Sequence, residues 1–287
     1  MSGTVAALAL ASALLSALAT IFIRAGLQRY HPYTGFWINL LVGTLGLWLA
    51  VALTGGPGHP TLWSLAFFVL AGLIGTVVGR LLRFFSIQAV GPSISAALVN
   101  LNPLVSTGLA ILILGERVTP MILAGTLVTI AGTTLLSLGG RRIGVRAALL
   151  LLPLGSAGCF GTVAVLRKLA LDGAGVVIGA AANVTAAFVT FTAFLMISGQ
   201  GAAMACRGRS LVYFVLAGIA ENLSVFLVLV ALGFGAVSVV TPLANISPIF
   251  VLLLSMVFLR ESEILNARLV AGTVLIVIGA YFITAFK

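Results

Sequence analysis

Glu221 is the residue of this chain whose position most favours chemistry, because it lies in AENLS, residues 220–224, inside a long apolar stretch. The other acidic residues fall at the ends of apolar stretches or between them: Glu116, Asp172, Glu261 and Glu263. A carboxylate in apolar surroundings is costly to bury and therefore indicates a functional site. Three roles stay open for Glu221: it binds a ligand's ammonium group, it carries a proton, or it is a static partner of Arg80 or Arg83.

A second feature is an Asn-x-x-Pro motif that occurs twice, in NLNPLVSTGLAILILGE at 100–116 and in NISPIFVLLLSMVFLRE at 245–261. Proline inside a helix removes a backbone hydrogen bond, and in apolar surroundings the freed carbonyl needs a protein partner or a wet cavity. We therefore predict that Pro103 and Pro248 act as hinges. The polar side chains beside them are expected to line a cavity: Asn100, Asn102, Asn245 and Ser247. The alternative is that these side chains only hold helices together.

Other polar and aromatic side chains within apolar stretches complete the candidate binding site. They are Arg80, Asn39, Asn222, Thr162, Asn183, Trp37 and Phe84. If the apolar stretches span a membrane, Trp37 has an alternative place at the interface, and Arg80 and Arg83 can extend their charged ends to the surface. Small residues spaced four apart predict close helix packing, namely Ser12, Ser16 and Thr20, and the pair Gly75 and Gly79.

Patterns typical of catalysis are missing from the sequence. There is no HExxH motif, no P-loop, no carboxylate cluster and no Ser/His pair within the apolar stretches. Cys159 and Cys206 do not have the spacing of metal ligands. We therefore expect no enzyme activity, no cofactor and no bound metal.

The composition requires a lipid surrounding for most of the chain. Of 287 residues, 61% are hydrophobic and only 7% are charged, whereas soluble domains carry about 25% charged residues. A membrane span needs about 20 apolar residues, so the length allows about ten spans. The predicted helices run near 4–23, 34–53, 61–87, 93–115, 119–139, 145–167, 175–198, 210–233, 236–259 and 265–286. The expected fold class is an all-α, polytopic membrane protein.

The repeated motif extends to the whole chain. FVLAG occurs at 68–72 and again at 214–218, and GT at 125–126 recurs at 272–273. We therefore expect two five-helix repeats, at 1–142 and 143–287, that together form one unit. Because five is an odd number, the second repeat enters the membrane from the opposite side. Such inverted repeats are typical of transporters that alternate access to a site at the repeat interface.

The charges predict an orientation. The net charge of +10 comes from arginines in loops that face anionic lipid, so no nucleic-acid partner is expected. One side of the bundle receives eleven cations: Arg24, Arg29, Arg80, Arg83, Arg141, Arg142, Arg146, Arg207, Arg209, Arg260 and Arg268. The other side receives four: Arg117, Arg167, Lys168 and Lys287. This count favours a cytoplasmic location for the first side and an external one for both termini.

Two Asn-x-x-Pro helices that end in LGER at 114–117 and LRES at 259–262, within ten helices in two repeats, resemble the drug/metabolite transporter superfamily. More narrowly, the chain is similar to its ten-helix EamA-type exporters over essentially its whole length. Relatives of this type commonly place both termini in the cytoplasm, which differs from the charge count.

The resemblance implies a small-molecule exporter of the bacterial inner membrane, most similar to exporters of aromatic and other neutral amino acids. The substrate would bind in a central cavity between the repeats, formed by the polar residues named above. The expected partners are an amino-acid-like substrate and the lipid bilayer, and the expected state is a monomer or a homodimer. Export of another small metabolite or drug, or a passive channel, stays open as an alternative.

Overall fold

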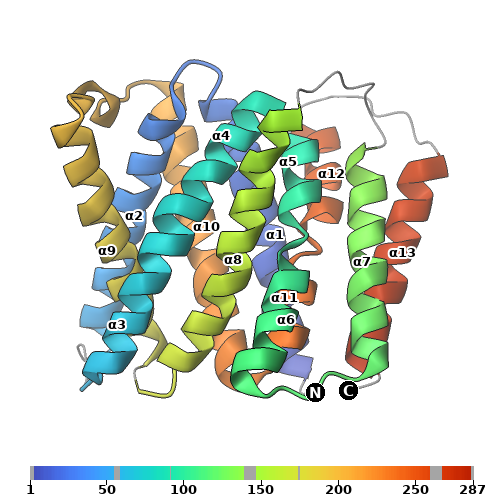
Figure 1. Ribbon diagram of the computed structural model, residues 1–287. Helices are drawn as coiled ribbons and strands as arrows, with labels where there is room; N and C mark the ends of the chain where they lie inside the picture. Colours follow the sequence, from blue (N-terminus) through green and yellow to red (C-terminus); the bar gives the residue numbers. More distant parts are fainter. Residues whose placement is uncertain are drawn as a thin grey trace.

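The computed structural model describes residues 3–54, 59–90, 92–138, 147–173, 175–258 and 267–285, and this part of the chain forms helices joined by turns, with no strand. The helices stand side by side in one bundle (Figure 1). Large apolar side chains are exposed on its outside, among them Leu112 and Ile197. Such a surface fits contact with lipid rather than water.

Six helical segments are long and apolar enough to cross a membrane: Gly3–Gly26, Pro32–Leu53, Leu62–Val90, Ala148–Ala170, Val176–Ile197 and Arg209–Phe234. Shorter apolar helices lie at Asn102–Leu114, Pro120–Leu135, Val237–Val251 and Val274–Ile283. The predicted boundary at 142–143 lies outside the described residues, as do Arg141, Arg142, Arg146, Arg260, Glu261, Glu263 and Lys287.

The first part of the chain forms α1 (Gly3–Gly26), α2 (Pro32–Leu53), α3 (Leu62–Ala71), the π-helix η1 (Gly72–Gly79), α4 (Arg80–Val90), α5 (Pro92–Val99), α6 (Asn102–Leu114) and α7 (Pro120–Leu138). The second part forms η2 (Ala147–Leu150), α8 (Leu151–Ala170), α9 (Val176–Ile197), η3 (Gly201–Met204), α10 (Arg209–Phe234), α11 (Val237–Ala244), α12 (Ser247–Phe258) and α13 (Ala267–Ala285). Both termini lie at the same end of the bundle (Figure 1).

Two of the predicted helices, 93–115 and 236–259, were each expected to be one helix with bent backbone at its proline, and the structure shows two separate helices in each range. Each is divided in two, by Asn100–Leu101 in the first case and by Asn245–Ile246 in the second. Backbone hydrogen bonds between residues three apart in the sequence bridge both breaks. At the first break they run from Leu101 N to Leu98 O and from Leu104 N to Leu101 O. At the second, 145 residues later, they run from Ile246 N to Leu243 O and from Ile249 N to Ile246 O. The two breaks are therefore local copies of each other.

The position of the prolines explains why the chain breaks before them. Pro103 lies in the first turn of α6, where its missing N–H costs no hydrogen bond and its fixed φ suits a helix start. Pro248 is the second residue of α12. Each proline therefore begins a half-helix, rather than bending the middle of a continuous one as the sequence suggested.

The two parts pack on each other in matched pairs. α1 packs on α10, and α8 packs on α3, η1 and α4; likewise α6 packs on α8 and α1 packs on α12. Between α7 and α13, an added Cβ at Gly125 would lie 2.7 Å from the carbonyl oxygen of Gly279, and one at Gly132 would lie 2.8 Å from that of Gly272. Because Gly125 matches Gly272 and Gly132 matches Gly279 in the repeat, these contacts have the pattern of a two-fold axis.

The π-helical segment η1 also owes its place to small residues. An added Cβ at Gly75 would lie 2.7 Å from Cγ2 of Val163, and one at Gly79 would lie 2.8 Å from Cβ of Cys159. The G-x-x-x-G pair therefore packs on α8 within the same chain. π-helical turns are frequent at functional sites, and here the segment places Thr76 and the following Arg80 beside a cavity.

Charged side chains bind the ends of two helices, and one of them, Glu116, connects the two parts of the chain. The carboxylate of Glu116, which follows α6, accepts hydrogen bonds from Val237 N at 2.8 Å and Ser238 N at 3.1 Å, the first residues of α11. Lys168 Nζ donates to the carbonyl oxygens of Leu232 at 2.7 Å and Gly235 at 3.2 Å, where α10 ends. An anion at a helix start and a cation at a helix end both compensate the helix dipole.

Candidate functional site

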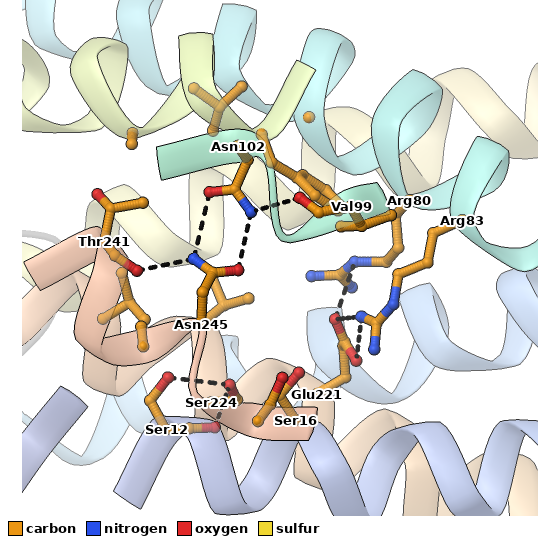
Figure 2. Close-up of a pocket in the computed structure, with 18 of the residues that line it drawn as sticks. Ser12, Ser16, Arg80, Arg83, Val99, Asn102, Glu221, Ser224, Thr241 and Asn245 are labelled. Carbon is orange, nitrogen blue, oxygen red and sulfur yellow. Dashed lines mark hydrogen bonds and ion pairs between the residues drawn. The ribbon is translucent and has the colours of Figure 1, made fainter. Parts of the chain in front are cut away.

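A cavity of about 160 Å³ lies where the two helix breaks meet. Its walls come from both parts of the chain, with α1, η1, α4, α5 and α6 on one hand and α8, α10, α11 and α12 on the other. Figure 2 shows two groups of polar side chains in it, an ion cluster of Arg80, Arg83 and Glu221, and an amide pair of Asn102 and Asn245.

Both arginines of the ion cluster lie against the carboxylate of Glu221. Arg83 Nη1 donates to both carboxylate oxygens of Glu221, at 2.8 and 3.1 Å, and Arg80 Nε lies 3.9 Å from Oε1. Arg83 Nη2 also donates to Thr20 Oγ1 at 2.6 Å. Glu221 is 5% exposed, so its charge is compensated by the two guanidinium groups rather than by water.

Two asparagines support this cluster from behind. Arg80 Nη1 donates to Asn39 Oδ1 at 2.9 Å. Asn222 Nδ2 in turn donates to the carbonyl oxygens of Asn39 at 3.1 Å and Gly218 at 2.8 Å. Asn39 and Asn222 are buried and are not part of the cavity wall. Their amides fix the orientation of Arg80 between α2 and α10.

The amide pair joins the two helix breaks directly. Asn102 Nδ2 donates to Asn245 Oδ1 at 2.8 Å, and Asn245 Nδ2 donates to Asn102 Oδ1 at 3.2 Å. Each amide also donates to a carbonyl of the short helix that ends beside it, Val99 O at 2.9 Å and Thr241 O at 2.7 Å. The last carbonyls of a helix have no partner within the helix, so Asn102 satisfies Val99 O at the first break. At the second break Asn245 adds a side-chain bond to Thr241 O, which also accepts from Asn245 N at 3.2 Å.

A third polar group lies around Arg167. This residue is in α8 and lines the cavity. Its Nη2 lies 3.4 Å from Asn183 Oδ1, an oxygen that also accepts a bond from Thr76 Oγ1 at 2.9 Å. Asn183 Nδ2 donates to Phe68 O at 3.1 Å. Asn183 therefore stands behind the wall and links Thr76 to Arg167.

The structure brings half of the twelve predicted binding residues to the cavity wall: Glu221, Arg80, Asn100, Asn102, Asn245 and Ser247. The others lie elsewhere: Asn39, Asn222 and Asn183 behind the wall, and Trp37, Phe84 and Thr162 in helix contacts. Trp37 Nε1 donates to Thr192 Oγ1 at 3.1 Å, Phe84 is fully buried against Phe36, and Thr162 Oγ1 bonds to Gly158 O in its own helix. Of the predicted hinges, Pro103 is buried beside the first break.

Comparison with known proteins agrees with this architecture. A sequence model of the EamA-like transporter family matches residues 3–138 and matches again at residues 147–285. The chain belongs to the EamA-like transporter family. It is therefore a multi-pass membrane protein of a transporter family, and the two matches fall on the two parts that pack in matched pairs.

The same fold is also seen in a solved structure. A structure described as "Crystal structure of protein" superposes on 100% of this chain and on 98% of its own length, with a TM-score of 0.81 and 17% sequence identity. At this identity the likeness concerns the fold alone. No curated protein matches the chain by sequence.

Several cavity residues of this EamA-like transporter were not predicted as binding residues: Ser12, Ser16, Thr20, Thr76, Arg167, Ser224 and Thr241. The spacing of Ser12, Ser16 and Thr20 was a usable signal, although it was interpreted as helix packing. In fact Ser224 Oγ donates to Ser12 O at 2.9 Å, so this stripe both packs α1 on α10 and lines the cavity.

Proposed function

We propose that the chain is a secondary transporter that exports small polar metabolites, with amino acids the first class to test, across the bacterial inner membrane. The observation that carries this proposal is the polar cavity at the junction of two broken helices in an apolar bundle. Half-helices that end near a shared cavity are how many transporters present backbone and side-chain polar groups to a substrate in the membrane.

The architecture behind this proposal is ten transmembrane segments in two inverted repeats, residues 1–142 and 143–287. The six long apolar helices supply six segments. The other four are α7, α13 and the two broken segments α5–α6 and α11–α12. The matched backbone hydrogen bonds at the breaks and the crossed glycine contacts between α7 and α13 support the repeat relation.

The mechanism that follows is alternating access. The two repeats contact each other through the amide pair on one side of the cavity and through the bonds of Ser12 and Ser224 on another (Figure 2). A rocking of one repeat against the other would exchange these contacts and open the cavity to each side of the membrane in turn. Movement would be accommodated at the breaks, where the hydrogen-bond ladder is already interrupted.

Counterflow in proteoliposomes tests this function. Purified protein is reconstituted, the vesicles are loaded with an unlabelled amino acid, and uptake of the same radiolabelled compound is followed, over a panel that includes neutral, acidic and aromatic amino acids. A carrier shows saturation and stimulation of uptake by substrate on the opposite side. A passive channel shows neither effect, and that outcome would contradict the proposed transporter and favour a channel. Vesicles prepared without the protein are the control.

A further inference from the structure

The cavity contains more positive than negative charge. Three of its lining residues are arginines, Arg80, Arg83 and Arg167, and one is acidic, Glu221. Glu221 pairs with Arg83 and lies near Arg80, and within the described part of the chain no carboxylate lies within 4.0 Å of Arg167. Three cations against one anion leave two positive charges without a counter-charge on the cavity wall. A charge buried without a partner is strongly unfavourable.

Two hydrogen-bond donors in the same cavity wall also have no acceptor. They are Arg167 Nε and Asn100 Nδ2, both buried and both without a hydrogen-bond partner among the described residues. Asn100 is 4% exposed. Leaving one such donor unsatisfied costs about 1–3 kcal/mol, and more when it is charged. Asn245 matches Asn100 in the repeat, yet Asn245 makes three amide bonds with Asn102 and Thr241.

The nearest contacts of Arg167 do not neutralise it. Its Nη2 is 3.4 Å from the neutral amide oxygen of Asn183, which Thr76 already uses. Arg167 therefore lines the cavity as a cation with an unsatisfied donor, together with the unsatisfied donor of Asn100 and the cation Arg80, and an oxyanion is the group that would satisfy them. Guanidinium groups bind carboxylates with short, charge-assisted bonds that suit this place.

We infer that the cavity binds a small organic anion, whose carboxylate takes the donors of Arg167 and Asn100. This inference rests on the proposed transport function and narrows its substrate class: the cargo carries net negative charge, as an acidic amino acid or a dicarboxylate does. A neutral amino acid has no net charge and would leave the two excess positive charges of the cavity wall uncompensated, whereas the second carboxylate of an acidic amino acid or a dicarboxylate adds negative charge. Acidic amino acids and dicarboxylates share the carboxylate that the site would bind, and an amino group is not required.

Two probe pairs of equal shape and different charge test this inference: glutamate against glutamine, and succinate against succinamate. In counterflow, we expect the more negative member of each pair to be carried faster. Arg167→Gln should reduce this preference by about tenfold or more, since a charge-assisted hydrogen bond contributes roughly 1.5–3 kcal/mol. Arg167→Lys should retain part of it, because the charge remains while the planar fork is lost.

Arg117→Gln is the matched control, because Arg117 is exposed in the turn before α7 and its loss removes the same charge. Thermal unfolding of each detergent-solubilised variant, with each probe at constant ionic strength, gives a second readout that does not depend on transport. Stabilisation by glutamate over glutamine, lost in Arg167→Gln and kept in Arg117→Gln, supports the anion site even if neither probe is transported. In that case it is the proposed transport that fails.

The opposite outcomes overturn the inference. If glutamine is carried as fast as glutamate, or if the preference for glutamate survives in Arg167→Gln, then Arg167 does not bind the substrate's carboxylate, although the transport function stands. If glutamate and succinate neither move nor stabilise the protein more than their amides do, then the cavity is not an anion site.

Discussion

The two helix breaks and the two segments that carry the charges differ in how far they obey the repeat. At the breaks, α5–α6 and α11–α12 share the same backbone hydrogen bonds at residues 145 apart. The segment α3–η1–α4 and its counterpart α10 do not match in this way. The first is interrupted by a π-helix and carries Arg80 and Arg83, whereas the second is one uninterrupted α-helix and carries Glu221.

This difference separates two tasks. A movement that opens the cavity to one side of the membrane and then to the other requires similar hinges in both repeats, and the two breaks are similar. A bound substrate has no two-fold symmetry, so the groups that recognise it need not be repeated. The ion cluster and Arg167 break the symmetry at the cavity, and we therefore assign recognition to them and movement to the breaks.

The largest effect is expected from Glu221→Gln, which removes the acidic member of the ion cluster. Arg83 then keeps Thr20 as a neutral acceptor, but the buried Arg80 and the partly buried Arg83 lose their counter-charge. Removing one partner of a buried ion pair costs about 3–5 kcal/mol, so we expect a clear drop in thermal stability in detergent. The double variant Arg83→Gln with Glu221→Gln should recover part of it. An unchanged melting temperature in the single variant would show that Glu221 is not a structural partner of the arginines.

The next effect concerns a feature that the repeats share, the glycine contact between α7 and α13. In Gly125→Ala the added Cβ would lie 2.7 Å from Gly279 O, a backbone atom that cannot turn away. We expect a loss of about 1–3 kcal/mol in unfolding free energy. Gly108→Ala is the control, because a Cβ at Gly108 in α6 meets no atom within 4 Å and a helical alanine is favoured over glycine. Equal stabilities of the two variants would contradict the close approach of α7 and α13.

These contrasts also show how much could be predicted from the sequence. Apolar runs and their repeat predicted the helical class and the pairing of the two Asn-x-x-Pro motifs. The side chains nearest the breaks could be predicted because a proline in an apolar helix leaves a backbone carbonyl that needs a polar partner or a wet cavity. Asn100, Asn102, Asn245 and Ser247 accordingly line the cavity.

What the sequence did not predict concerns the phase of individual helices. A π-helical turn rotates the residues after it relative to those before it, so a 3.6-residue period could not show which residues of this segment, Thr76 and Arg80 among them, line the cavity. Arg167 was predicted to be the last residue of its helix, at the membrane surface, because a cation at the end of an apolar run usually marks that surface. In the structure α8 continues to Ala170, and Arg167 remains within the helix.

A smaller effect is expected at the amide pair, which tests whether the two breaks act together. Asn102→Ala and Asn245→Ala each remove the two mutual hydrogen bonds and one side-chain bond to a helix-end carbonyl. In a double-mutant cycle of thermal unfolding, we expect a coupling energy of about 0.5–2 kcal/mol, since the second substitution removes bonds already lost. Additive effects would show that the amides contribute independently. Asn222→Ala, which lies outside the pair, should add to either variant.

The smallest effect on stability is expected at the prolines, where the comparison of the two breaks is sharpest. In Pro103→Ala the new N–H falls in the first turn of α6, where helix donors lack an intrahelical acceptor in any case. The unfolding free energy should therefore change by no more than about 0.5 kcal/mol. The break itself persists, because Asn102 still donates to Val99 O and Asn245 Oδ1.

A stable variant of this kind isolates the hinge role, because a hinge substitution alters the transport rate without changing a group that contacts the substrate. We expect counterflow to slow in Pro103→Ala, and by a similar factor in Pro248→Ala, because the two prolines begin matching half-helices. Wild-type rates in both variants would remove the hinge role. A slow rate in only one would show that the two breaks, although alike in hydrogen bonding, do not share the movement equally.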